Sequence, residues 1–226
     1  CIEAQSAEEI IETAKHLAPT FGAIDIEDVS SPNISNVVKA LQSIEIPVFS
    51  DDQQGSSAVV LAALTNALAV VDKKISDIKV VIHGAGAAGI AVTDMLLYVG
   101  VKNIVLLNSK GILGPQNPSM NSIQRSMSER VNPEGLKGNL DDAIEGADVY
   151  VGLSSRGKFS CDQIKRMNSS SIVFPLSVPY PEITEEEARS AGARIVAMGL
   201  TSCKNPMPNL PIYPGLVRGL LDVRAT

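Results

Sequence analysis

The sequence predicts an α/β fold built on a doubly wound parallel sheet. Short apolar segments alternate with helical segments from residue 79 onward, which is typical of parallel strands covered by helices on both faces. A glycine-rich turn, KVVIHGAGAAG at residues 79–89, joins an apolar strand to an apolar helix. Together these observations favour a Rossmann-like dinucleotide-binding domain.

Three helices are expected before residue 79. Ser6 followed by Glu9 is a capping-box pattern, which predicts the first helix start. Ser31 and Pro32 predict the start of a second helix. Residues 55–71 are apolar almost all round, so we expect a long helix that is deeply buried. The composition changes near residues 52–55, which predicts a domain boundary there.

The remaining elements follow from local apolar patterns and turn residues. Two short strands are expected early in the chain, at 21–24 before an acidic loop at 25–28, and at 47–49. The strands of the parallel sheet are expected at 79–83, 103–107, 148–153, 171–176 and 194–198. Helices are expected near 87–99, 120–130, 139–145, 160–167, 184–191 and 216–223.

The glycines of the turn fit the pattern G-x-G-x-x-G. In such a turn Gly84 makes the tight bend, Gly86 lets the backbone approach a diphosphate, and Gly89 allows the helix to pack closely on the strand. The pattern alone is weak, but the strand before it and the helix after it are both present. The sequence therefore predicts dinucleotide binding rather than a merely structural turn.

Composition excludes several classes of function. The 226 residues are 45% hydrophobic and 19% charged, with a formal net charge of −6 and no basic run. We therefore expect no nucleic-acid partner and no binding to an anionic membrane. The apolar run 58–71 is too short to span a bilayer. Cys1, Cys161 and Cys203 fit no zinc site or disulfide framework, so we expect reduced thiols in a cytoplasmic protein.

Three carboxylates lie at expected strand-to-helix junctions. Glu27, Asp28 and Asp52 supply hard oxygen ligands of the kind that suit Mg²⁺ or Mn²⁺. The alternative is that they are solvated loop acids, with Asp51 or Asp52 capping the next helix. Their spacing alone favours this second interpretation.

The chain resembles the malic enzyme family over essentially its whole length. The resemblance is carried by the segments APTFGAIDIEDV (18–29), IPVFSDDQQG (46–55), VVIHGAGAAGIA (80–91), NSKGIL (108–113), GADVYVGLSS (146–155), PEITEEEARSAGARIVAMG (181–199) and YPGLVRGLLDVRA (213–225). It implies that residues 1–54 are the C-terminal part of a smaller α/β catalytic domain, and that residues 55–226 form the dinucleotide-binding domain.

The resemblance also implies roles for individual residues. Glu27, Asp28 and Asp52 match the ligands of a divalent metal, and Asp51 matches a catalytic acid that supports them. Asn209 matches a substrate-binding amide. The expected cofactor-binding residues are Gly84, Ala85, Gly86, Ala87, Ala88, Gly89, Asn108, Ser109 and Ser154.

The implied activity is the oxidative decarboxylation of malate, a small dicarboxylate, to pyruvate and CO₂ with NAD(P) and Mg²⁺ or Mn²⁺. The family's base and acid, a lysine and a tyrosine, belong to a stretch upstream of Cys1. We therefore expect this chain alone not to turn over malate. The resemblance also implies a homodimer or a higher homo-oligomer.

Three positions depart from the family pattern. Val178 stands where an asparagine usually bonds the substrate carboxylate, and Pro208 replaces the first residue of an Asn-Asn pair. Arg156 stands where small residues or proline are usual; it is either a surface side chain or a compensating carboxylate clamp. These departures leave two alternatives open, a metal-dependent oxaloacetate decarboxylase and a non-catalytic dinucleotide-binding paralogue.

The cofactor choice depends on the end of the second strand of the large sheet. A carboxylate about 20 residues beyond the glycines usually holds the ribose 2′-hydroxyl. Here Asn108 occupies that point, with Ser109 and Lys110 after it, so no negative charge repels a 2′-phosphate. We expect NAD as the cofactor, with NADP as an alternative. Neither His16 nor His83 is assigned to catalysis.

Overall fold

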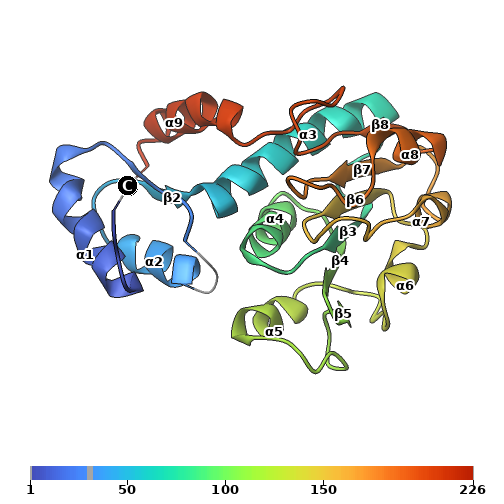
Figure 1. Ribbon diagram of the computed structural model, residues 1–226, viewed down its shortest axis with the longest axis horizontal. Coiled ribbons are helices and arrows are strands. Elements are labelled where there is room, and N and C mark those ends of the chain that lie inside the picture. Colours follow the sequence, from blue (N-terminus) through green and yellow to red (C-terminus); the bar gives the residue numbers. More distant parts are fainter. Residues whose placement is uncertain (1, 30–32, 226) are drawn as a thin grey trace. The chain divides into compact units, whose positions relative to one another are not determined.

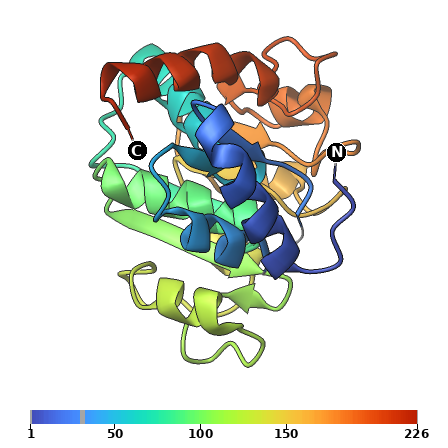
Figure 2. The ribbon, with the colours of Figure 1, turned by 90° about the vertical axis from the view of Figure 1, so that its left-hand side faces the viewer.

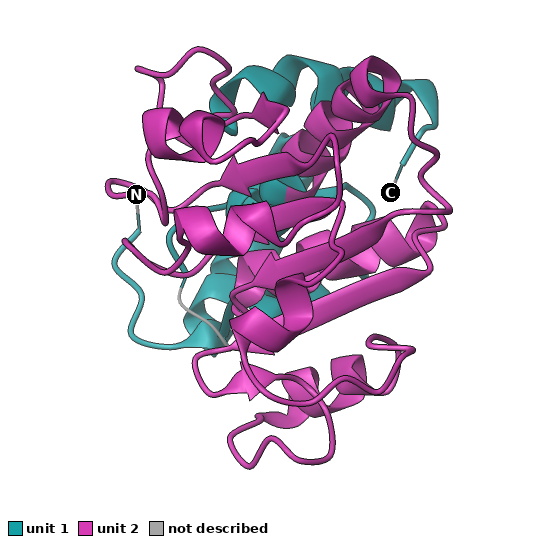
Figure 3. Ribbon diagram, turned by 90° about the vertical axis from the view of Figure 1, so that its right-hand side faces the viewer, with its two compact units in different colours: residues 1–56, 209–226 teal, residues 57–208 magenta. Residues whose placement is uncertain are grey.

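The computed structural model describes residues 2–29 and 33–225. It forms two compact units, one of Cys1–Ser56 with Asn209–Thr226 and the other of Ser57–Pro208 (Figure 3). The C-terminal segment, assigned by sequence to the dinucleotide-binding domain, thus shares a compact unit with the N-terminal residues. The division into family domains at residues 54 and 55 stays a prediction.

Unit 1 contains a two-stranded parallel sheet and several helices. Its elements are α1 (Ala7–Leu17), the 3₁₀ turn η1 (Ala18–Thr20), β1 (Ile24–Ile26), α2 (Asn33–Leu41), β2 (Val48–Ser50), the π-helical turn η2 (Asp51–Gly55), the 3₁₀ turn η3 (Leu210–Ile212) and α9 (Tyr213–Asp222). The expected helix start at Ser6 is confirmed, since its side chain accepts a hydrogen bond from the Glu9 N–H. Helices α1 and α2 pack side by side (Figure 2).

The predicted strand at 21–24 is wrong in its position. Strand β1 runs from Ile24 to Ile26 and pairs in parallel with β2, so Asp25 lies within a strand rather than in the expected loop. Pairing with a distant partner decides the boundary, which the local pattern does not contain. The predicted helix start at Ser31 and Pro32 lies outside the described residues.

Unit 2 confirms the predicted α/β fold. Its six-stranded sheet has the order β5-β4-β3-β6-β7-β8 (Figure 1). The parallel strands are β3 (Lys79–His83), β4 (Asn103–Asn108), β6 (Val149–Gly152), β7 (Ile172–Pro175) and β8 (Ile195–Val196). Strand β5 (Gly111–Ile112) pairs antiparallel with β4 and was not expected, because two residues are too short to show a periodicity.

Two hydrophobic cores cover the two faces of this sheet. Alternate residues of one strand contribute to different cores: Val80 and Ile82 pack in one, and Val81 packs in the other. The first core contains residues of α3 (Ser56–Val71), α4 (Ala87–Tyr98) and α5 (Ser122–Ser128). The second contains residues of α6 (Leu140–Ile144), α7 (Cys161–Lys165) and α8 (Glu185–Ser190). The sheet is therefore covered by helices on both faces.

Helix α3 is less buried than its composition predicts. Val60, Leu64 and Leu68 are buried against the sheet, whereas Val70 is 62% exposed. Only one stripe of a helix can face a flat sheet, whatever the composition of its other side. With η2, the helical stretch Asp51–Val71 reaches 21 residues, longer than expected and long enough by length and composition to cross a membrane. A core helix of a soluble protein meets the same criterion, so this stretch carries no membrane assignment.

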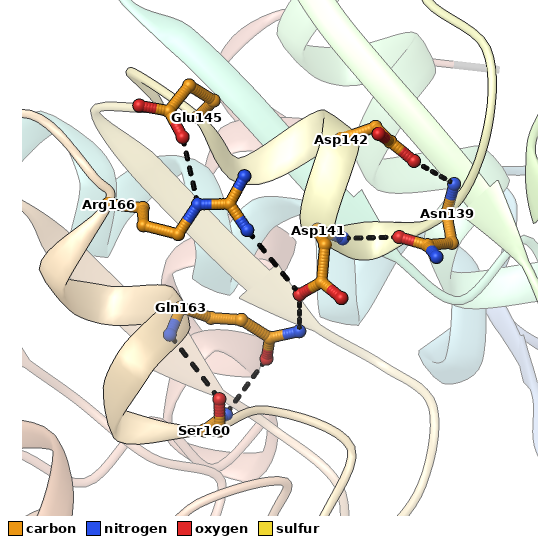
Figure 4. Close-up of polar contacts among 7 residues, drawn as sticks. All are labelled: Asn139, Asp141, Asp142, Glu145, Ser160, Gln163 and Arg166. Carbon is orange, nitrogen blue, oxygen red and sulfur yellow. Dashed lines mark hydrogen bonds and ion pairs between the residues drawn. The ribbon is translucent and has the colours of Figure 1, made fainter.

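A surface network joins α6 and α7 (Figure 4). Asn139 and Ser160 cap these helices through capping boxes with Asp142 and Gln163, which confirms both expected helix starts. The two helices are then linked to each other, because the Gln163 amide donates to Asp141 at 2.7 Å. Arg166 adds ion pairs to Glu145 at 2.8 Å and Asp141 at 3.8 Å. Exposed pairs of this kind each contribute roughly 0–1 kcal/mol.

A more buried ion pair anchors the first strand of the large sheet. The Asp148 carboxylate accepts hydrogen bonds from Lys73 Nζ at 2.7 Å, the Lys79 N–H at 2.8 Å and Asn168 Nδ2 at 3.0 Å. Burial works to raise the pKa of Asp148, but the three hydrogen bonds and the charge of Lys73 outweigh it and leave that pKa lowered.

We expect Asp148→Asn to destabilise the protein by roughly 2 kcal/mol near neutral pH, because Lys73 loses its ion-pair partner and keeps only its hydrogen bond to the Ser169 carbonyl. Because the pKa of Asp148 is lower in the folded protein than in the unfolded chain, the ionised carboxylate stabilises the fold at any pH above its unfolded-state pKa of about 3.9. This stabilisation is lost as the pH falls through the folded-state pKa. The difference between the wild type and the variant should therefore shrink on acidification. Urea unfolding at several pH values measures this. Asp162→Asn, at an exposed Asp–Lys pair, is the control and should change little.

Candidate functional site

The acidic residues of unit 1 gather at one edge because their strands are parallel neighbours. Ile24 pairs with Val48, and Ile26 pairs with Ser50, so β1 and β2 end side by side. Residues that follow parallel strands emerge at the same edge of a sheet. Glu27 and Asp28 follow β1, and Asp51 and Asp52 follow β2.

Hydrogen bonding, partial burial and the charges of neighbouring acids raise the pKa of two of these acids. For Glu27 the largest cause is a hydrogen bond with Asp25, followed by the negative charge of Asp25 and smaller effects that include the charges of Asp51 and Asp28. For Asp52 the largest cause is partial burial, followed by the charges of Asp51, Asp28 and Glu27. The ion pairs found in the described ranges 2–29 and 33–225 include none of these five acids. Excess negative charge is therefore concentrated at this edge.

The C-terminal segment of unit 1 contacts the same acids. The Asn209 amide donates to Asp51 Oδ2 at 3.3 Å and to Ser56 Oγ at 3.1 Å. The Tyr213 hydroxyl donates to Asp25 Oδ2 at 2.9 Å, and its ring packs against Phe49 with centroids 5.9 Å apart. Burial, followed by hydrogen bonds to Asp51 and Asp25, raises the pKa of Tyr213 well above its ordinary value.

The chemistry of this edge fits a divalent cation, although its side chains do not converge on one point. Asp25 Oδ1 and Asp51 Oδ1 are buried and have no hydrogen-bond partner within the described part of the chain, and both are acceptors that a cation satisfies. No group of three His, Cys, Asp or Glu side chains in residues 2–29 and 33–225 is arranged to hold a metal. The ligand set Glu27, Asp28 and Asp52 thus stays a prediction.

The glycine-rich turn of unit 2 follows β3 and needs its glycines for different reasons. Gly84 has a φ of +133°, and a Cβ there would lie 2.2 Å from the Leu153 carbonyl oxygen. A Cβ on Gly89 would lie 1.7 Å from the Gly84 carbonyl oxygen, so this glycine allows α4 to pack against the turn. A Cβ on Gly86 would meet no atom within 4 Å. Gly86 is thus open to a ligand.

The turn leads into the N-terminus of α4, which suits an anion. The Ile90 N–H donates to the Gly86 carbonyl at 3.0 Å, so the N–H groups of Ala87, Ala88 and Gly89 precede the first intrahelical bond. Free N–H groups and the helix dipole favour a bound phosphate at this position. The predicted contacts of the turn residues with a cofactor diphosphate have suitable geometry and stay predictions.

Asn108 lies at the end of β4, where the sequence places the ribose contact. Its Oδ1 accepts from the Lys110 N–H and from Asn117 Nδ2, and its own amide donates to the Ser119 carbonyl and to Gln124 Oε1. Gln124 in turn donates to the Ala85 carbonyl at 2.8 Å, which links this strand end to the glycine turn. Ser109 and Lys110 are exposed. Asn108 therefore orders the loop that presents them.

The loops after β6 and β7 carry the remaining predicted positions. Ser154 and Arg156 are exposed in the first loop, and Val178 is 66% exposed in the second. The Arg156 guanidinium lies over the Tyr180 ring, 5.2 Å from its centroid, so the two loops are in contact. The exposed Arg156 thus packs on an aromatic ring, and its role as a carboxylate clamp stays a prediction.

His83 ends β3 and is not suited to carry a proton near neutral pH. Burial lowers its pKa, with the Glu182 charge opposing this and the Lys158 charge adding to it. Its Nδ1 lies 3.2 Å from the Tyr150 hydroxyl, which is itself fully buried. These contacts make His83 a packed residue of the sheet.

Three residues near the candidate sites were not identified from the sequence. Asp25 and Tyr213 complete the acidic edge of unit 1, and Glu182 is a fully buried acid in unit 2. Asp25 is adjacent to the predicted acids, so its proximity was a usable signal. No local pattern distinguishes Glu182 from the exposed glutamates that follow it, because its burial depends on loops brought together by the sheet.

Comparison with known families identifies most of the chain, including the whole of unit 2. Residues 53–225 match the family model described as "Malic enzyme, NAD binding domain". The chain belongs to the malic enzyme family. This agrees with the glycine turn, the sheet order and the resemblance noted in the sequence, and it supports NAD(P) as the cofactor of this malic enzyme domain.

Individual relatives give the same result. The chain is 42% identical over 226 residues to an "NAD-dependent malic enzyme" of Geobacillus stearothermophilus and covers 47% of that protein. It is 40% identical to a "Bifunctional malic/malolactic enzyme" of Bacillus subtilis, of which it covers 55%. The crystal structure of an NAD-dependent malic enzyme from Thermotoga maritima matches with a TM-score of 0.93 at 41% identity, over 97% of this chain and 59% of that one. The chain thus spans about half the length of these malic enzymes.

We expect Gly86→Ala to weaken NADH binding at least about tenfold while leaving thermal stability nearly unchanged. The added methyl group meets no protein atom within 4 Å but occupies the space that a diphosphate needs. Titration of NADH fluorescence and thermal unfolding measure the two effects. Gly89→Ala is the contrasting variant: it should lower thermal stability, because its Cβ would meet the Gly84 carbonyl. Unchanged NADH affinity in Gly86→Ala would contradict the proposed path of the diphosphate.

Proposed function

We propose that the protein containing this chain catalyses the oxidative decarboxylation of malate to pyruvate and CO₂, with NAD(P) and Mg²⁺ or Mn²⁺. The observation that carries the proposal is the 42% identity to an NAD-dependent malic enzyme over the whole chain, which includes both the acidic edge and the glycine turn. We propose NAD as the usual cofactor, with NADP tolerated because Asn108 brings no negative charge to the ribose position.

Glu27, Asp28 and Asp52 would hold the metal ion in this proposal. Their support is the shared edge after β1 and β2, the raised pKa values of Glu27 and Asp52, and the unsatisfied oxygens of Asp25 and Asp51. A bound divalent cation would supply Lewis-acid stabilisation of negative charge on the oxygens of the substrate. Asp51 acts through Asn209, because it accepts the hydrogen bond that orients that amide.

The glycine turn and Asn209 have separate roles. The N–H groups at the start of α4 bind the cofactor diphosphate, so the nicotinamide is held by a rigid element. The partly buried Asn209 amide donates to Asp51 and Ser56, so its Oδ1 is the atom that would accept a hydrogen bond from a substrate hydroxyl. When bound, NAD(P) would supply the acceptor for the hydride from the C2 atom of malate, and the hydroxyl proton would go to the base of the reaction. The base and the acid of the reaction lie, in this proposal, outside the chain.

A metal-dependent oxaloacetate decarboxylase is the second candidate. It is favoured by Val178, an exposed apolar side chain in the loop after β7, where the family pattern has an amide that bonds the substrate carboxylate. Losing such a bond costs about 1.5–3 kcal/mol and weakens malate binding. This candidate needs the acids of unit 1 and no cofactor reduction. Oxaloacetate loss that is unaffected by removal of the nucleotide would favour it.

Turnover assays test the proposed function directly. The chain and a longer protein that contains it would each be given malate, Mn²⁺ and either NAD or NADP. We expect reduced cofactor only from the longer protein, since this chain spans about half of its relatives. Absence of reduced cofactor in both would contradict the oxidoreductase assignment. A cytoplasmic location and a homo-oligomeric state are part of the same proposal.

We expect Asp52→Asn to weaken Mn²⁺ binding to the chain at least about tenfold, because one anionic ligand becomes neutral. Isothermal titration with Mn²⁺ alone measures the affinity. Glu45→Gln removes the same charge from an exposed position of unit 1 and is the matched control. Equal losses in the two variants would indicate a general effect of net charge and would contradict a site at Asp52.

A further inference from the structure

Glu182 is a fully buried acid that the proposed function does not use. Its relative exposure is 0%, and it lies between β7 and α8 in unit 2. Burying a carboxylate costs several kcal/mol unless hydrogen bonds replace its lost hydration. The partners of this side chain therefore indicate what it does.

The partners of Glu182 come from two different loops. Its Oε1 accepts from the Ser154 N–H at 2.9 Å and from the Ser177 hydroxyl, and its Oε2 accepts from the Ser177 N–H at 3.3 Å. Ser154 belongs to the loop after β6, and Ser177 belongs to the loop after β7. One carboxylate thus ties together two loops that are not consecutive in the chain.

The end of β6 is shaped to admit this carboxylate. A Cβ on Gly152 would lie 2.6 Å from Glu182 Cδ, so any other residue at position 152 would displace the acid. Gly152 is also the last residue of β6, and its carbonyl accepts from the Leu176 N–H at 2.9 Å. The carboxylate is therefore built into the carboxyl edge of the sheet.

This edge is where the second half of a dinucleotide is expected to bind. The sheet order reverses between β3 and β6, and ligands of such sheets bind across that point, outside the carboxyl ends of the strands. The glycine turn after β3 and the loop after β4 serve one nucleotide half. The loops after β6 and β7, which Glu182 joins, serve the other half, the nicotinamide.

We propose that Glu182 is a positioning residue that sets the loops after β6 and β7 for the nicotinamide half of the cofactor. The inference deepens the proposed function and rests on it. The Ser154 N–H is bonded inward to Glu182, which leaves the exposed side chain of Ser154 as the group offered to the cofactor. Without the carboxylate, Ser154 and Ser177 lose their shared acceptor, and the contact of Arg156 with Tyr180 remains as a link between the two loops.

The test compares two ligands that share the adenosine diphosphate half. NADH and ADP-ribose are titrated against the chain and its Glu182→Gln variant, at a temperature where both are folded by circular dichroism. Glutamine has nearly the same volume as glutamate, but one carboxylate oxygen is replaced by an NH₂ group. That group is a donor, so it cannot accept the hydrogen bond that Ser154 or Ser177 offers at its position. We expect NADH affinity to fall about tenfold or more, which is a loss of at least ~1.4 kcal/mol of binding free energy. We expect ADP-ribose affinity to change less than about twofold.

Two further variants keep the test decisive. Ser177→Ala removes the hydroxyl that donates to Glu182 and keeps the acid, so it should lower NADH affinity by about threefold. This variant replaces Glu182→Gln in the test if Glu182→Gln does not fold. Glu186→Gln changes an exposed acid on α8 and should leave both affinities unchanged. Equal losses for the two ligands, or no loss for either, would overturn the proposal, as would a wild-type chain that binds no NADH. Because only binding is measured, a lack of malate turnover overturns the proposed function separately.

Discussion

Parallel pairing of strands is the constraint on which both candidate sites depend. When two strands run in the same direction, the residues that follow them emerge at one edge of the sheet. In unit 1 the pairing of β1 with β2 brings acids 24 residues apart, Asp28 and Asp52, to a common edge. In unit 2 the same rule gathers the glycine turn and the loops after β4, β6 and β7.

Charge and burial then give the two edges different chemistry. In unit 1 a hydrogen bond with Asp25 is the main cause that raises the pKa of Glu27, partial burial is the main cause for Asp52, and the charges of neighbouring acids add to both. Two buried carboxylate oxygens, Asp25 Oδ1 and Asp51 Oδ1, have no hydrogen-bond partner among the described residues. In unit 2 the acid Glu182 is fully satisfied by donors from two loops. An unsatisfied group of acids suits a bound cation, whereas a satisfied buried acid holds the backbone in place.

The fold of unit 2 also depends on glycines, whose lack of a side chain lets neighbouring atoms approach closely. Gly84 and Gly89 allow backbone atoms to approach where a Cβ would overlap a carbonyl oxygen, and Gly152 gives its space to the Glu182 carboxylate. Gly86 differs from these three, because no protein atom lies near its absent Cβ. Gly84, Gly89 and Gly152 are therefore required for packing within the protein, whereas Gly86 faces the position expected for the ligand.

The sequence by itself determined the α/β fold, the glycine turn, the helix cap at Ser6 and the helix positions near 139–145 and 160–167, because these depend on local periodicity and local hydrogen bonds. It also located the acids of unit 1, through their place after short apolar segments. Tertiary structure alone decided the limits of β1, the exposed side of α3 and the antiparallel β5. It alone revealed the burial of Glu182 and the contact of Tyr213 with Asp25, because both join residues that only folding brings together.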